Sequence, residues 1–457
     1  MRRGRDQSER QRVPAPLIRR RIASGRGAIE QPNATPDGDA ALTPRFWLAL
    51  VITGVATGLL GDLMMAVLRL FEYIGYGHRA GSYQAAVEAV GGVRRVLVLV
   101  VAGMIGAVGW YLIRSRLRHE HAEIDDALWR GDGRLSFRRS ILTSTLSEMV
   151  IGLGASIGRE AAPKLMGGAA GSSMADRFGL TPAQRRLLVA CGGGAGFAAV
   201  YNVPLGGALF VAEVLYGSLA LPVVLPALAT TFIATVTAWL TLPSGATYVD
   251  VPLYRDSGSL ITWSAVAGIL MGLLAVGYVR LIGWVSHHRA SGRTMLWAMP
   301  VVFAGVGVLG IWFPQLFGNG KDMAHQAFLG VGSLGLLFAF AALKPIATAA
   351  TLGSGGAGGV FTPFLSAGAV LGAVLGIVWS HLWPGTPVGA YALVGAAAML
   401  GASMQAPLAG LVLVLELTHG AFDLVPPMVI ATVLATILVR QIDGYSMYSA
   451  RLPRRDE

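Results

Sequence analysis

The chain has 457 residues, of which 54% are hydrophobic and only 13% are charged, with a mean hydropathy of +0.59. Soluble domains carry about 25% charged residues, so this composition excludes an ordinary soluble globular protein and indicates a polytopic, all-α membrane protein. The net charge of +11 comes mostly from Arg in tails and loops, which fits a positive-inside orientation better than nucleic-acid binding.

Residues 1–44 form a polar, Arg-rich segment with clusters at Arg2-Arg3 and at Arg19-Arg20-Arg21. There is no apolar run at the very start, so a signal peptide is not indicated. The segment also lacks interleaved aromatic residues, which argues against a nucleic-acid partner. We expect a disordered cytoplasmic tail, followed by a first membrane half over residues 45–242.

The first half opens with apolar segments at about 46–70 and 96–113, each long enough to cross a membrane. A charged connection over 114–139 contains Arg118-His119-Glu120-His121. A His-x-His pair can bind a metal, but no other ligand clusters with it, and the lone Cys191 excludes a multi-Cys site. We therefore predict no metal and no cofactor.

From Ser140 onward many apolar stretches are short and are interrupted by Gly or Pro. After a polar link at 243–259, the second membrane half is predicted over 260–450, followed by a short basic cytoplasmic tail at 451–457. The expected stretches are 140–157, 161–175, 186–200, 206–217, 219–242, 260–285, 295–313, 328–341, 345–352, 361–383, 389–402, 407–418 and 426–439. Several cannot span about 30 Å of hydrocarbon, and such broken helices are tolerated only around a protected cavity, as in transporters and channels.

An internal repeat relates the two halves. The stretch from Asn202 to Glu213 resembles the stretch from Gln405 to Glu416, with an offset of 203 residues (416 − 213 = 203). Gly–Pro interruptions near 158–163 and 359–363 recur at nearly the same offset. Matching interruptions in two related halves place a binding site where the repeats meet.

The first interruption, Gly158-Arg159-Glu160-Ala161-Ala162-Pro163, places an Arg and a Glu inside very apolar sequence. A charge at membrane depth costs several kcal/mol and is a functional hypothesis by default. The Gly and the Pro end one helix and begin another, so Glu160 is expected at a helix N-terminus, where anions are favoured. These residues together indicate a gated anion path.

The second interruption is the Gly-rich run that ends in Gly359-Val360-Phe361-Thr362-Pro363. It can aim backbone N–H groups at an anion, with Pro363 in the first turn of the next helix. A soluble phosphate loop would need a Gly-Lys-Ser/Thr ending, which is absent. We expect the two helix N-termini to converge on one anion; a plain packing hinge is the alternative.

With these two motifs and the repeat, the chain resembles the CLC chloride channel and transporter family. Gly158-Arg159-Glu160 is similar to that family's Gly-Arg-Glu-Gly-Pro element, and Gly359 to Pro363 is similar to its Gly-x-Phe-x-Pro element. The segment Asp443 to Ser449 is similar to its closing segment, whose anion-facing Tyr is placed on Tyr448, with Tyr445 second. The resemblance covers about residues 45–452. It is greatest to the bacterial ClcB-type voltage-gated chloride channels.

The resemblance implies an inverted repeat of about 17 or 18 helices, many of them broken, in a homodimer with one pore per subunit. It implies Glu160 as a protonatable gate. The anion-binding residues it implies, through backbone N–H or hydroxyl groups, are Gly158, Arg159, Ala161, Val360, Phe361 and Tyr448. For Arg159 a structural salt bridge is an equal alternative.

Three departures from the family pattern bear on function. The Gly-Ser-Gly-Ile-Pro element is missing, and its Ser falls near His119, which becomes a candidate for the inner site or a proton relay. Ala161 replaces a Gly, and Pro163 comes one residue late. The inner proton-transfer Glu of the exchangers is replaced by Val214, which leaves Glu213 as a candidate relay or as a structural residue.

These features predict a gated, passive chloride channel in the bacterial inner membrane, with both termini cytoplasmic. The family resemblance adds the expectation of an electrical shunt during acid stress. A proton-coupled chloride antiporter is the close alternative. An enzyme or a scaffold is disfavoured because no catalytic constellation is visible. The few residues after Tyr448 predict no nucleotide-binding regulatory domain.

Overall fold

The computed structural model describes residues 41–117 and 121–452. Most of the predicted N-terminal tail, His119 and all but the first two residues of the C-terminal tail therefore lie outside the described residues. Within the described ranges every regular element is a helix. The one strand-like pairing there is a bridge between Gly158 and Gly359.

The helices follow the two halves of the sequence. Those of the first half are α2 (Pro44–Tyr76), α3 (Tyr83–Ala89), α4 (Gly92–Arg116), α5 (Ile124–Arg130), α6 (Phe137–Gly152), α7 (Ala161–Arg177), α8 (Pro182–Tyr201), α9 (Pro204–Phe210) with its π-helical continuation η1 (Val211–Tyr216), and α10 (Leu221–Ala238). Those of the second half are α11 (Gly258–His287), α12 (Thr294–Trp312), η2 (Pro314–Leu316), α13 (Lys321–Phe328), α14 (Leu334–Gly353), α15 (Phe361–Ser380), α16 (Val388–Met404), α17 (Pro407–Thr418), η3 (Phe422–Leu424), α18 (Val425–Ile442) and η4 (Ser449–Arg451).

Among the described residues, eight segments are long and apolar enough to cross a membrane. In seven of them, half or less of the most apolar window is buried inside the protein, which leaves one side of each helix for lipid. In α15 the buried share is 78%. The helix that begins at Phe361 is therefore surrounded by protein, and its N-terminus is shielded from lipid.

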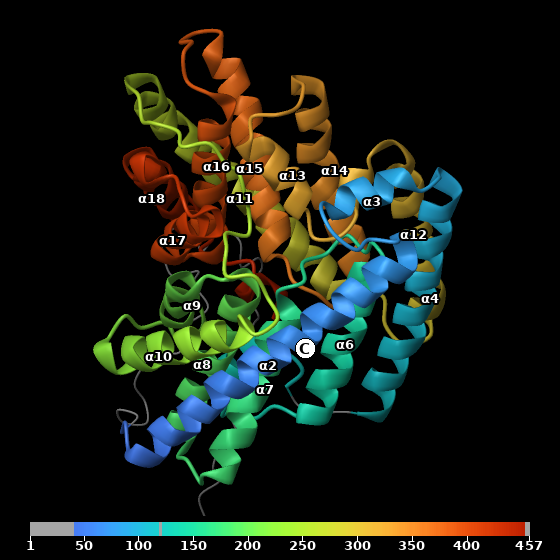
Figure 1. The fold of residues 1–457 in the computed structure, drawn as a ribbon, viewed down its shortest axis with the longest axis vertical. Coiled ribbons are helices and arrows are strands. Elements are labelled where there is room, and N and C mark those ends of the chain that lie inside the picture. Colours follow the sequence, from blue (N-terminus) through green and yellow to red (C-terminus); the bar gives the residue numbers. More distant parts are fainter. Residues whose placement is uncertain (1–40, 118–120, 453–457) are drawn as a thin grey trace, which may run out of the picture.

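Figure 1 shows α2 running diagonally in front of α6, α7 and α8, while α15 to α18 gather in the upper part of the view. Helices α4 and α12 lie side by side at the right edge and pack closely, because Gly103 meets the backbone of Pro300 without an intervening side chain. Close approach through small residues is the usual way in which membrane helices pack.

The structure corrects some predicted boundaries. The stretches 328–341 and 345–352 were expected to be separate, but α14 continues through Pro345. A proline inside a membrane helix is tolerated where neighbouring protein satisfies the freed backbone carbonyl. The short helices α3, α5 and α13 were not predicted, because each is too short and polar to stand out by hydropathy.

The repeat is visible in the backbone. Asn202 and Gln405, which are 203 residues apart (405 − 202 = 203), each end a helix in the left-handed region with φ of 57°. A proline two residues later then begins α9 or α17. The sequence similarity therefore reflects one local structure that occurs twice.

The two copies of this structure cap each other. The Glu213 carboxylate accepts hydrogen bonds from the N–H groups of Leu408 and Ala409 at 3.3 and 2.6 Å, at the start of α17. The Glu416 carboxylate accepts from Leu205 and Gly206 at 3.0 and 2.6 Å, at the start of α9. A reciprocal contact of this kind is what a two-fold relationship between the halves produces.

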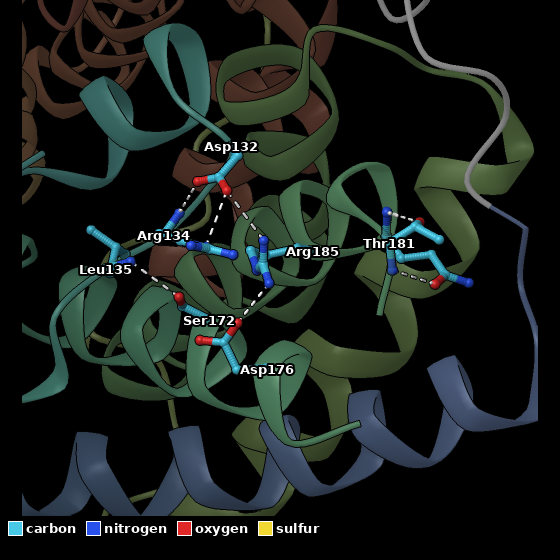
Figure 2. A network of polar contacts seen from close by, with 8 residues as sticks. Asp132, Arg134, Leu135, Ser172, Asp176, Thr181 and Arg185 are labelled. Carbon is cyan, nitrogen blue, oxygen red and sulfur yellow. Dashed lines mark hydrogen bonds and ion pairs between the residues drawn. The ribbon is translucent and has the colours of Figure 1, made fainter. Parts of the chain in front are cut away.

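A polar network fastens the loop after α5 to α7 and α8 (Figure 2). Arg185 of α8 pairs with Asp132 at 3.3 Å and with Asp176 of α7 at 2.6 Å, and the Leu135 N–H donates to Ser172 Oγ at 3.0 Å. At the start of α8, Thr181 and Gln184 form a capping box. The network fixes the position of α5, which contributes to the site described next.

Candidate functional site

The two predicted interruptions meet in space. Gly158 and Gly359 exchange backbone hydrogen bonds of 2.8 Å in each direction. The loop before α7 and the loop before α15 therefore lie antiparallel to each other. This contact brings Glu160, the residue before α7, to the N-terminus of α15.

Glu160 occupies that N-terminus. Its Oε1 accepts a hydrogen bond from the Phe361 N–H at 2.6 Å, and its Oε2 accepts one from the Thr362 hydroxyl at 3.2 Å. The Tyr201 hydroxyl donates to the same Oε2 at 3.4 Å and is also hydrogen-bonded to Thr362 Oγ1 at 2.9 Å. The side chain is buried, and its carboxylate caps the N-terminus of α15, which begins 201 residues later in the chain.

A helix N-terminus carries about half a positive charge and unsatisfied N–H groups, which stabilise an anion. The carboxylate of Glu160 therefore occupies a position that an external anion could take. Arg159 lies beside this position, with its guanidinium carbon 5.1 Å from the centre of the Tyr201 ring. That arrangement places the Arg159 charge next to the residues that hold Glu160.

A cavity of about 100 Å³ is lined by Glu160 and by several basic residues. Its lining combines the two loops with residues from several helices and from the C-terminal segment. The predicted site residues that line it are Glu160, Ala161, Val360 and Tyr448; its charged lining residues are Arg114, Glu123, Asp125, Arg139, Glu160, Lys164, Arg289 and Arg451. Five of these eight are cationic, so the cavity favours anions.

Lys164 places a full positive charge inside this cavity. Its Nζ lies 3.0 and 3.2 Å from the two carboxylate oxygens of Asp125, and 4.6 Å from the centre of the Tyr448 ring. The exposed fractions of the Lys164 and Asp125 side chains are 9% and 6%. The cavity therefore contains a buried ion pair in addition to backbone donors.

Lys344 of α14 is a second buried cation, and it lies near the loop that precedes α7. Its Nζ donates to Ser156 Oγ at 2.9 Å and to the carbonyl oxygens of Leu316 and Gly318 at 3.1 and 2.7 Å. All three ammonium protons are thus used, and Lys344 is fully buried. It holds the loop that precedes Glu160 and is close enough to act on that carboxylate electrostatically.

Glu148 of α6 is a third unexpected charged residue. It is fully buried, and within the described part of the chain neither carboxylate oxygen has a hydrogen-bond partner. It lies within electrostatic range of Arg159, Glu160 and Glu72. A buried acid without partners is costly and is usually retained for function.

Other predicted site residues lie elsewhere. Glu213 does not line the cavity, because its carboxylate caps α17. The lining also lacks Gly158, Arg159 and Phe361. The backbone of Gly158 holds the loop before α7 in place, and the backbone N–H of Phe361 holds the Glu160 carboxylate. His119 lies outside the described residues.

Comparison with known proteins identifies the family. The model of the family described as voltage gated chloride channel matches residues 102–440, which include both interruptions and both capping glutamates. The chain belongs to the CLC family.

Curated relatives of this CLC protein include the voltage-gated ClC-type chloride channel ClcB of Salmonella typhi, which is 32% identical over 406 residues and is matched over 96% of its length and 86% of this chain. The ClcB of Shigella flexneri is 31% identical over 419 residues, covering 88% of this chain and 97% of the relative.

Solved structures share its fold. A slow cyanobacterial Cl⁻/H⁺ antiporter superposes with a TM-score of 0.78 at 20% identity, over 89% of this chain and 97% of that one. A CLC-type fluoride/proton antiporter superposes with a TM-score of 0.70 at 21% identity, over the same shares. The inverted-repeat, all-α membrane fold predicted from the sequence is thus confirmed.

Sequence reasoning missed several residues in and around this candidate site. Lys164 and Lys344 both interrupt apolar sequence, so the argument that singled out Glu160 could have found them. Tyr201 and Asp125 gave no such signal, because only the fold brings Tyr201 to the Glu160 carboxylate and Asp125 to the cavity. The lining of the cavity thus includes the full cationic charge of Lys164 as well as backbone donors.

Proposed function

We propose that this protein is a gated, passive chloride channel in which Glu160 is the protonatable gate. The observation that carries the proposal is the hydrogen bond from the Phe361 N–H to Glu160 Oε1 at 2.6 Å. This bond holds the Glu160 carboxylate at the N-terminus of α15, and Glu160 also lines the cavity that favours anions.

The mechanism is a competition for the same donors. While Glu160 is ionised, its carboxylate occupies the positive end of α15 and excludes other anions. Protonation removes the charge and weakens the hydrogen bond from Phe361, so the side chain can leave and an anion can take its place. Acidification on the side from which protons reach Glu160 therefore opens the path.

Passive conduction is favoured by Val214, which stands at the position where an exchanger of this family would need its inner acid. Val214 is buried in η1 and cannot carry a proton. Glu213 beside it holds two backbone N–H groups of α17, so protonating it would weaken a helix cap. Backbone donors at the gate also bind anions without trapping them.

The second candidate is a proton-coupled antiporter. It is supported by the titles of the two solved structures named above and by the buried Asp125, which lines the same cavity as Glu160. In that reading Asp125 would receive the proton that Val214 cannot hold.

The assembly we propose is a homodimer in the bacterial inner membrane. Apolar side chains remain exposed on α9, α10, α17 and α18, the helices around the reciprocal glutamate caps; they include Leu205, Leu225, Phe232, Leu408, Val429 and Val433. A second copy or lipid would cover them. The arginines among the lining residues support a cytoplasmic opening of the cavity by the positive-inside rule.

The test uses purified protein in liposomes with a chloride gradient and no pH gradient. Chloride efflux and proton movement are recorded for the wild type, Glu160→Gln and the peripheral control Asp256→Asn, which changes an exposed carboxylate. The proposal expects chloride flux without uphill proton uptake, with Glu160→Gln faster and less dependent on pH. Uphill proton movement in the wild type establishes the antiporter, and an unchanged Glu160→Gln removes Glu160 from the gate.

A further inference from the structure

The Lys164–Asp125 pair is a built, buried polar site with no part in the gate mechanism above. Lys164 lies in the first turn of α7, where its N–H donates to the Glu160 carbonyl at 3.2 Å. Its side chain extends from there along the cavity to Asp125 and Tyr448. Lys164 thus lies on the same helix turn as the gate and on the same cavity.

The position of Asp125 is fixed by the packing of α5. Ile124 lies against Gly168 of α7 and Gly193 of α8, where any Cβ would overlap its Cδ1 atom. On the other side of the helix, Trp129 donates from Nε1 to the Leu215 carbonyl at 3.1 Å. The carboxylate of Asp125 is therefore presented to Lys164 by a rigidly docked helix.

A buried ion pair of this kind is weak evidence for stability. Removing both charges from water is costly, and a hydrophobic pair of similar size is often as stable or more stable. A pair retained on the wall of an anion-attracting cavity therefore calls for a functional explanation. An ammonium in a low-dielectric cavity is a stronger anion ligand than a neutral donor.

The arrangement parallels that of the gate. At one position of the cavity, the Glu160 carboxylate occupies the positive end of α15. At the other, the Asp125 carboxylate is paired with the Lys164 ammonium. In each case an internal carboxylate holds the place of an external anion.

We propose that Lys164 is a fixed-charge ligand for chloride or a similar monovalent anion, and that Asp125 is its tethered competitor. The anion would lie between the Lys164 ammonium and Tyr448, in the cavity that Glu160 also lines. The inference deepens the proposed function, because it rests on the cavity being an anion path. It does not depend on whether transport is passive or proton-coupled.

The pair also predicts how occupancy is limited. With Asp125 present, an incoming anion must displace a carboxylate, which weakens its binding and speeds its release. Without Asp125, the ammonium would bind the anion more tightly and slow its departure. Conduction requires binding strong enough for entry and weak enough for exit, which the competitor would supply.

The experiment measures sodium chloride binding to the full-length purified protein by isothermal titration calorimetry. The variants are Asp125→Asn, Lys164→Met and the double substitution. Asp126→Asn is the control for Asp125, since it changes the next carboxylate of α5, which pairs with His121 at 3.0 Å. Lys321→Met is the control for Lys164, since Lys321 lies outside the cavity lining.

The proposal expects Asp125→Asn to lower the chloride dissociation constant at least tenfold and Lys164→Met to raise it by a similar factor. The gain from Asp125→Asn must vanish when Lys164 is also Met, which the double-mutant cycle shows directly. An unchanged affinity in Lys164→Met, or a gain from Asp125→Asn that persists without the lysine, overturns the proposal. So does an absence of chloride binding in protein that still conducts chloride.

Lys164→Met leaves an unpaired buried carboxylate, so it is the variant at greatest risk of misfolding. The double substitution removes both charges, so its chloride dissociation constant can be compared with that of Asp125→Asn even if Lys164→Met misfolds. Independently, crystals of Asp125→Asn protein grown in bromide locate the anion by its anomalous signal. A peak beside Lys164 Nζ supports the site, and peaks only beside Phe361 overturn it.

Failure of this inference differs from failure of the proposed function. Binding is measured at equilibrium without a gradient, whereas the gate is tested by the flux of Glu160→Gln. A flux unaltered by Glu160→Gln, together with lysine-dependent binding, removes the gate and keeps the site.

Discussion

Gly158 and Gly359 exchange two backbone hydrogen bonds of 2.8 Å, although they lie 201 residues apart (359 − 158 = 201). This backbone contact, together with the hydrogen bond from the Phe361 N–H to Glu160, sets the position of the loop before α7 relative to α15. Neither position has room for a side chain, because a Cβ on either glycine would overlap the Glu160 carboxylate. A substitution at either glycine would therefore displace the Glu160 carboxylate without removing the acid.

Gly359→Ala is therefore expected to push the Glu160 carboxylate off the Phe361 N–H while the acid itself remains. Chloride flux at neutral pH should rise toward that of Glu160→Gln, because the donor is freed without protonation. Liposome efflux measures the change. Gly305→Ala is the control, since a Cβ there meets nothing within 4 Å; a Gly359→Ala flux that stays at the wild-type value contradicts the prediction.

Glu213→Gln and Glu416→Gln are each expected to destabilise the protein to a similar extent. Each substitution removes the charge from a pair of hydrogen bonds to helix N–H groups, and such bonds are worth about 1.5–3 kcal/mol each when charged. Thermal unfolding in detergent measures the loss, with Asp256→Asn as control. If Glu213→Gln alters proton movement while the melting temperature stays constant, Glu213 is a relay after all.

Lys344→Met is expected to destabilise the protein and to disturb the gate together. It leaves Ser156 and the carbonyls of Leu316 and Gly318 without their shared donor in a buried site, at a cost of about 1–3 kcal/mol for each unsatisfied group. Lys321→Met serves as the matched control. A stable Lys344→Met protein with a wild-type pH response of flux would show that this ammonium supports neither the loop nor the gate.

Glu148→Leu is expected to raise the melting temperature, because it replaces a fully buried carboxylate that lacks hydrogen-bond partners within the described residues. It should also make acid activation of flux less steep, since Glu148 lies within electrostatic range of Glu160 and its charge therefore acts on that carboxylate. Flux measured as a function of pH tests this. A melting temperature that falls would assign Glu148 a structural role.

The sequence was sufficient for the features that local chemistry determines. The breaks around Glu160 and Phe361, and the repeat ending in Glu213 and Glu416, follow from Gly, Pro and charge placed in apolar sequence, and the structure contains both. The predicted interruption before Pro345 was wrong, because α14 continues through the proline and the packing around this helix outweighs the local cost of that residue.

The contacts that define the candidate site were beyond prediction from one sequence. Tyr201 and Thr362, which hold the Glu160 carboxylate, lie 161 residues apart (362 − 201 = 161) and share no pattern. Asp125 reaches Lys164 only because α5 docks on glycines of α7 and α8. Such pairings depend on the tertiary fold.

The reciprocal caps have a consequence for how the chain is assembled. Each half supplies the carboxylate that completes a helix in the other, so neither half is finished alone. Severing the backbone in the polar link near residue 245, where added atoms meet open space at Gly245, would leave every one of these contacts in place. Two separately synthesised fragments should then combine into one working protein, while each fragment made without the other should be degraded.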